Sequence, residues 1–158
     1  MSKRFKMGSV YPEAYEAMDA LDQLVSSSKT DPWYRELIRI RASQINGCAY
    51  CVNAHTLDAL GLQVPSGKIA LIPVWREAGP AFSEQERAIL QLTEAVTAIH
   101  LGGLNDEIYN TCLRLFGERL VAELLMAIIT INAWNRIGVG LKLEPSVTWH
   151  QESQISDT

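Results

Sequence analysis

The chain has 158 residues, of which 47% are hydrophobic and 20% charged, and a formal net charge of −4 at pH 7. This size and composition suit a single globular domain over residues 1–158, whose core needs no disulfide or structural metal. The acidic balance and the absence of a long basic tract exclude the usual electrostatic footprint of a nucleic-acid-binding protein, so we expect no nucleic-acid partner.

The first half of the chain carries the pattern of three helices. Apolar residues recur at helical spacing over residues 11–25, and a second helix is predicted over 32–46, where Asp31 offers an N-cap and a glycine follows the last turn. A third is predicted from Cys48 to about residue 60, again before a glycine. Residues 66–75 are apolar but contain a proline, which favours one or two helical turns and a connector.

The second half predicts three further helices and no strand. Ser83 and Glu86 form a capping-box pattern that opens a helix to about residue 99, and helices over 105–117 and 118–141 follow. The last is apolar around most of its circumference, which is typical of a central or interface helix. The sequence therefore predicts an all-α fold, a compact single-domain bundle of about six to seven helices.

The expected core spans about residues 31–141, and we expect a flexible tail after residue 145. The most apolar stretch, 120–131, is shorter than the about 20 residues that cross a bilayer and is interrupted by Glu123. The amino end has no apolar segment typical of a secretion signal. These features predict a cytoplasmic protein without a membrane partner.

Two of the three cysteines, Cys48 and Cys51, form a close pair, which in a reducing compartment indicates redox chemistry or metal binding. On a helix that begins at Cys48, the pair and His55 fall within an arc of about 60°. The helix start favours a thiolate at Cys48. His55 is spaced to accept the proton of Cys51, which makes Cys51 the candidate nucleophile and Cys48 the thiol that then forms a disulfide with it.

Other interpretations of the pair stay open. The thiols could be buried and inert, or they could be half of a zinc site that also uses His55 and Glu36, although no second close pair of cysteines supplies further ligands. Cys112 lies among apolar residues on a predicted helix, where a cysteine is usually a small core residue.

The segment from Glu36 through Cys48-Ala49-Tyr50-Cys51 to His55 resembles the core motif of the carboxymuconolactone decarboxylase superfamily, in its alkyl hydroperoxidase D-like (AhpD-like) branch. Residues 75–78 and 83–97 also look typical of single-domain members. The resemblance implies an AhpD-like helical fold and thiol-dependent peroxidase activity. It also implies that Cys51 is oxidised first, that Cys48 is its partner, and that His55 and Glu36 relay protons.

The same resemblance implies the partners of the reaction. They are hydrogen peroxide or an organic hydroperoxide as substrate and a lipoylated or thioredoxin-like dithiol as reductant, in a trimeric or hexameric homo-oligomer that needs no cofactor and no metal. One residue departs from the pattern, because the best-characterised peroxidase of the family has a histidine where this chain has Tyr50. A tyrosine, with a pKa of about 10, accepts protons poorly at neutral pH, so we expect slower peroxide reduction or another substrate.

The alternative, from a different functional class, is a zinc-binding or redox-sensing protein. It would use Cys48, Cys51, His55 and Glu36 without turnover.

Overall fold

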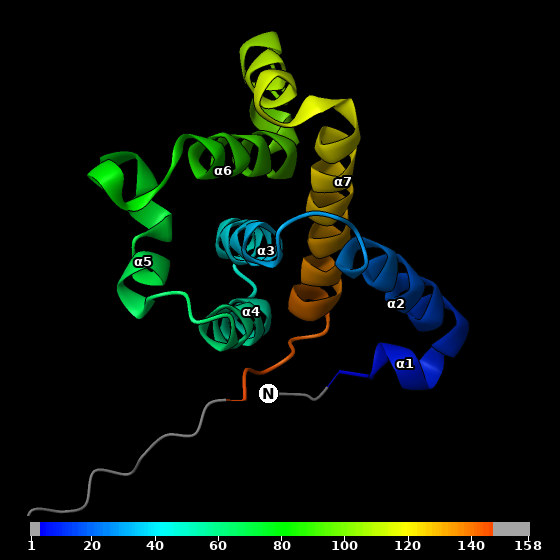
Figure 1. The fold of residues 1–158 in the computed structure, drawn as a ribbon. Coiled ribbons are helices and arrows are strands. Elements are labelled where there is room, and N and C mark those ends of the chain that lie inside the picture. The colour runs from blue at the N-terminus through cyan, green and yellow to red at the C-terminus, as the bar shows by residue number, and fades with distance from the viewer. Residues whose placement is uncertain (1–3, 147–158) are drawn as a thin grey trace, which may run out of the picture.

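The computed structural model describes residues 4–146, and all regular structure in that part of the chain is helical (Figure 1). The α-helices are α1 (Met7–Val10), α2 (Pro12–Ser26), α3 (Pro32–Asn46), α4 (Ala49–Gly61), α5 (Ser66–Ala70), α6 (Glu84–Thr97) and α7 (Asp106–Gly140). Short 3-10 segments lie at Ile72–Glu77, Gly79–Ala81 and Ile99–Leu101. The predicted all-α fold is confirmed, whereas the tail expected after residue 145 lies almost wholly outside the described residues.

Local signals place most helix ends where the sequence predicts them. The Asp31 side chain accepts a hydrogen bond from the backbone N–H of Trp33 at 2.8 Å, and Ser83 and Glu86 form the complete capping box. Asn105 caps α7 in the same way. These side chains satisfy N–H groups that the first turn of a helix leaves unpaired. Gly47 ends α3 in the left-handed conformation, at φ 68°, where glycine pays no steric penalty.

Two details differ from the predicted elements: the short helix α1, which was not predicted, and the backbone of Cys48. The two helices expected over 105–117 and 118–141 are confirmed, because α7 breaks at Gly117 (φ 71°, ψ 165°), and Figure 1 shows the change of direction in its yellow part. Cys48 has an extended backbone (φ −88°, ψ 90°) and is the N-cap of α4 rather than its first helical residue. Within the described residues, no helix is long and apolar enough to cross a membrane.

The helix α3 lies at the centre of the fold and packs against α4, α6 and α7 (Figure 1). Completely buried aliphatic side chains of α3, α6 and α7 form the core between these helices: Leu37, Ile38, Ile40, Leu90, Leu92, Leu124 and Ile128. Each large aliphatic side chain contributes about 1.5–3 kcal/mol when it leaves water. This core fixes α3 between the two helices, α4 and α7, that carry the residues discussed below.

Two carboxylates of α6 anchor α5 and the segment that follows it. Glu86 accepts a hydrogen bond from Lys68 Nζ at 2.6 Å, and Glu94 accepts from Trp75 Nε1 at 2.9 Å and from Arg41 Nε at 2.8 Å. Burial alone would raise the pKa of each carboxyl group, but these donors outweigh it and lower both pKa values below 4.5. Both groups therefore stabilise the fold in their ionised form.

Candidate functional site

The cysteine pair lies at the start of α4. Cys48 and Cys51 are joined by a disulfide, with their Cα atoms 5.3 Å apart. The backbone N–H of Cys51 points at Cys48 Sγ, 3.3 Å away, so the sulfur replaces the oxygen that usually caps a helix. Both residues are buried, with 2% and 5% of their surface exposed.

A partly buried polar relay begins at His55, one turn beyond Cys51. His55 Nδ1 lies 2.9 Å from Glu36 Oε2, and Arg39 donates to the other oxygen of Glu36 at 2.7 Å. Arg39 also donates to Asp22 of α2 at 3.0 Å. Since the second ring nitrogen of His55 has no hydrogen-bond partner among the described residues, it is free to exchange a proton with a bound molecule.

The electrostatics of Glu36 keep it ionised. Only 6% of its surface is exposed, and this burial by itself would raise the pKa of the carboxyl group. The hydrogen bond and charge of His55 and the guanidinium of Arg39 outweigh burial and lower the pKa of Glu36 below 4.5. An ionised Glu36 accepts a hydrogen bond from His55 and so orients its imidazole, as the carboxylate of a Cys–His or Ser–His site does.

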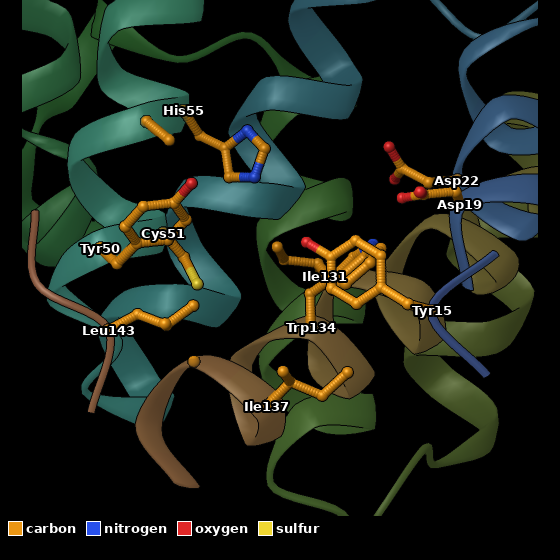
Figure 2. A pocket seen from close by; sticks show the side chains of 12 residues that line it. Tyr15, Asp19, Asp22, Tyr50, Cys51, His55, Ile131, Trp134, Ile137 and Leu143 are labelled. Atoms are coloured by element: carbon orange, nitrogen blue, oxygen red, sulfur yellow. The ribbon is translucent and has the colours of Figure 1, made fainter. Parts of the chain in front are cut away.

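Cys51 and His55 share the wall of one cavity (Figure 2). The cavity has a volume of about 230 Å³ and lies between α2, α4 and α7. Figure 2 shows the sulfur of Cys51 and the imidazole of His55 on one side, opposite Tyr15 and Trp134. The full lining is Tyr15, Asp19, Asp22, Tyr50, Cys51, Ala54, His55, Ile131, Trp134, Ile137, Gly138 and Leu143. A small molecule in this cavity would reach both the sulfur and the histidine.

Cys48 does not line this cavity, so the prediction that both cysteines and His55 share one helix face is wrong for Cys48. That projection assumed a helical backbone at Cys48, but the residue is extended and precedes the helix. It instead lines a more open groove of about 490 Å³. The groove is formed by Ser43, Gln44, Gly47, Cys48, Ala49, Val52, Asn53, Thr56 and Pro145.

Gly138, which was not among the predicted site residues, lets α7 reach the disulfide. A Cβ atom at Gly138 would lie 2.8 Å from Cys48 Sγ and 3.4 Å from Cys51 Sγ, closer to the first than van der Waals contact allows. A glycine inside a helix costs about 1 kcal/mol relative to alanine, which is the signal that could have pointed to close packing here.

A network of amides fixes α7 against α3. Asn46 Nδ2 donates to the side-chain oxygens of Asn132 and Asn135, each at 2.9 Å, and Asn135 Nδ2 donates to Ser43 Oγ at 2.9 Å. Both asparagines of α7 thereby have hydrogen-bond partners, which offsets the cost of removing their amides from water. Ser43 and Asn46 lie in the last turn of α3, just before the cysteine motif, so this network fixes the position of the motif relative to α7.

Arg39 and Tyr15 were also missed. Arg39 follows Glu36 at i+3, a spacing that pairs side chains along a helix, so a search for charge pairs would have found it. Tyr15 reaches the cavity from α2 and packs edge-on against Trp134, with ring centroids 5.1 Å apart. Nothing in the sequence links Tyr15 to the cysteines, since only tertiary packing brings α2 to them.

Among the described residues, the side chains able to offer a metal a compact set of donor atoms are Glu36, His55 and Asp58, within 4.8 Å of one another. This set does not contain the two cysteines, which are bonded to each other. Both oxygens of Glu36 already accept hydrogen bonds from Arg39 and His55. The four ligands proposed for a zinc site therefore do not converge in this oxidised state.

Fold and site together define an all-helical protein with a closely spaced cysteine pair beside a histidine that contacts a buried glutamate. The chain belongs to the carboxymuconolactone decarboxylase family, whose model matches residues 12–95. It is 33% identical over 141 residues to the uncharacterized protein YdfG of Bacillus subtilis (strain 168), covering 89% of this chain and 95% of YdfG.

Solved structures agree with this family. The crystal structure of ATU0492 from Agrobacterium tumefaciens, a protein of unknown function proposed to be the antioxidant defence protein AhpD, superposes with a TM-score of 0.89 at 37% identity. The match covers 93% of this chain and all of ATU0492. The debrominase Bmp8 shares the fold, with a TM-score of 0.78 at 20% identity over 88% of this chain and 74% of Bmp8. The resemblance to an AhpD-like fold is thereby confirmed.

Proposed function

We propose that this protein is a thiol-dependent peroxidase that reduces hydrogen peroxide or an organic hydroperoxide through Cys51 and Cys48. One observation carries the proposal: the two cysteines are close enough to form a disulfide, and Cys51 lies in the wall of a small cavity that it shares with His55. The likeness to ATU0492, proposed to be an antioxidant defence protein, supports the same activity.

The proposed reaction has two steps on the protein. The thiolate of Cys51 attacks one oxygen of the hydroperoxide, the O–O bond breaks, and the leaving alkoxide takes a proton to become an alcohol. Cys51 is then a sulfenic acid. The thiolate of Cys48 attacks the sulfur of Cys51, the S–O bond breaks, and the departing hydroxide takes a proton to become water. The peroxide has accepted two electrons, and the cysteines have become a disulfide.

His55 supplies the proton transfers in this proposal. It takes the proton of the Cys51 thiol and returns it to the alkoxide, and Glu36 with Arg39 holds the ring in place. Tyr50, at the position of the family's histidine, is 42% exposed and lines the same cavity, where its hydroxyl can donate a hydrogen bond. We propose that this exchange slows peroxide reduction without abolishing it.

A dithiol, either lipoylated or thioredoxin-like, would reduce the disulfide and complete the cycle in the cytoplasm. We also propose a homo-oligomer, a trimer or a hexamer. Exposed apolar side chains on α7 and its neighbour α2, among them Leu24, Met126 and Ile129, support this assembly because a lone monomer would leave them in water.

Steady-state peroxide consumption with a dithiol tests the activity. We expect turnover in the wild type, none in Cys51→Ser, and at most one oxidation in Cys48→Ser. We also expect His55→Ala to raise the pKa of the Cys51 thiol. Cys112→Ala is the matched control, because this third cysteine is buried and burial raises the pKa of its thiol. Full turnover in Cys51→Ser would refute the proposal, and stoichiometric zinc without turnover would favour the zinc-binding or redox-sensing alternative.

A further inference from the structure

The two sulfurs of the disulfide are reached from opposite sides of α4. On this helix the cavity is lined by Tyr50, Cys51, Ala54 and His55, and the groove by Ala49, Val52, Asn53 and Thr56. At about 100° of rotation per residue, the centres of these two sets lie about 180° apart. Cys51 therefore faces the cavity, and Cys48, as the N-cap, faces the groove.

The third side of the disulfide is closed by the backbone of α7. Gly138 lies so close to both sulfurs that not even a methyl group would fit beside Cys48 Sγ. Of the described openings, the cavity reaches Cys51 and the groove reaches Cys48, and these are the two routes to the disulfide that we compare.

The two openings differ in charge. The carboxylates of Asp19 and Asp22 line the cavity, and those of Glu36 and Asp58 lie next to its histidine. The positive charge of Arg39 pairs with Asp22 and Glu36, which offsets only part of this negative charge. None of the described residues that line the groove carries a charge. A neutral hydroperoxide enters the acidic cavity without an electrostatic penalty, but the thiolate that reduces a disulfide is an anion and is repelled there.

We propose that the reductant reaches the disulfide through the groove and attacks Cys48, so that substrate and reductant use opposite sides of α4. This inference rests on the proposed function. The reductant's thiolate forms a bond to Cys48 Sγ, the Cys48–Cys51 bond breaks, and its electron pair leaves on Cys51, beside His55. The second thiol of the reductant then displaces Cys48 from the mixed disulfide, the reductant becomes a cyclic disulfide, and its two protons pass to the two cysteines.

The groove also indicates the chemistry of the reductant's end. It is larger and more open than the cavity, at about 490 against about 230 Å³, and its lining combines apolar surface with neutral side chains such as Asn53 and Thr56. A slender dithiol arm whose only charge is its attacking thiolate fits this surface, since the described lining of the groove holds no carboxylate that would repel the thiolate. A protein that presents a charged face would find no complementary residue along the groove walls.

A trapping experiment on the wild type tests which sulfur is attacked. The oxidised protein is treated briefly with 2-mercaptoethanol, quenched with acid and alkylated with iodoacetamide, and fragment-ion mass spectrometry locates both labels. We expect mercaptoethanol on Cys48 and the alkyl group on Cys51, with at least about tenfold preference. Equal labelling, or mercaptoethanol on Cys51, would overturn the proposal. No peroxide is involved, so the result is independent of whether the protein is a peroxidase.

Blocking variants test the two routes separately. The side chain of Val52 leans along α4 toward Cys48, so Val52→Trp fills the groove, whereas Leu143→Trp fills the cavity. Leu57→Trp is the matched control, because Leu57 is exposed and lines neither opening. Oxidation of the reduced protein by cumene hydroperoxide and reduction of the oxidised protein by dihydrolipoamide are timed as separate single turnovers.

We expect Val52→Trp to slow reduction at least about tenfold and to leave oxidation within about twofold of the control. We expect Leu143→Trp to slow oxidation at least about tenfold and to leave reduction within about twofold of the control. If Leu143→Trp slows reduction as much as Val52→Trp does, the groove is not the route of the reductant and the proposal fails. If all variants and the wild type lack oxidation by peroxide but keep this pattern for reduction, the proposed function fails while the groove assignment stands.

Discussion

Gly138→Ala is the substitution that tests the packing of α7 on the disulfide. The added Cβ would lie 2.8 Å from Cys48 Sγ and 3.4 Å from Cys51 Sγ. The disulfide cannot swing aside as the end of a flexible side chain would, because it is held by two backbone segments. Relief must come from a shift of α7 or of the start of α4, and either shift disturbs the walls of both openings.

The expected magnitude follows from two opposing effects. Alanine in place of glycine inside a helix stabilises by about 1 kcal/mol, and overpacking a closed site costs about 1–3 kcal/mol. The contact with Cys48 is shorter than real Cβ atoms tolerate, so we place the cost at about 2–3 kcal/mol. The net loss of unfolding free energy is then about 1–2 kcal/mol, which lowers Tm by about 2–8 °C for a chain of this size.

Urea unfolding of the oxidised protein, followed by circular dichroism, measures this loss. Gly140→Ala is the matched control: it lies two residues further along the same helix end, and a Cβ there meets nothing within 4 Å. We expect Gly140→Ala to be neutral or to stabilise by up to about 1 kcal/mol. The reasoning is refuted if Gly138→Ala is as stable as Gly140→Ala and its cysteines react at the wild-type rate.

Three further predictions concern buried polar groups. Glu36→Gln weakens the orientation of His55, so we expect single-turnover oxidation of Cys51 to slow at least about tenfold, given that general acid–base assistance contributes about 10²–10⁴-fold; an unchanged rate would contradict the relay. The pKa of Glu94 is lowered in the fold, so its stabilising effect is complete above its ordinary pKa of 4.5 and is lost as pH falls through the lower folded value. The stability difference between wild type and Glu94→Gln in urea should therefore shrink from about pH 6 to about pH 3, and a constant difference would show that the ionised form is not the stabilising one. Asn135→Leu leaves the amide of Asn46 and the hydroxyl of Ser43 short of a partner, and we expect a loss of about 1–3 kcal/mol in urea unfolding; a loss below about 0.5 kcal/mol would mean that water replaces the network.

The parts of the fold that local chemistry determines could be predicted from the sequence. Asp31, Ser83 and Asn105 cap helices because their side chains satisfy N–H groups only a few residues away. The turn at Gly47 is also determined locally, because glycine adopts the positive φ that ends α3. The class of the fold and the family followed from such signals and from the spacing of Glu36, the cysteines and His55, and both are confirmed.

The features that the sequence did not reveal depend on tertiary contacts or on one pair of backbone angles. A single extended residue moved Cys48 from the face of Cys51 to the opposite opening, and no helical projection contains that information. Tyr15 and Gly138 reach the site from helices far away in the chain. The break at Gly117, by contrast, falls at the predicted boundary between two helices, where glycine adopts a positive φ without steric penalty.

The most direct test of the central claim is a count of free thiols on reduced, metal-free protein before and after one equivalent of peroxide, with mass spectrometry to locate any new bond. A redox-active pair predicts the loss of two thiols as a Cys48–Cys51 disulfide while Cys112 stays free. Cysteines that do not react with peroxide would contradict the proposed chemistry.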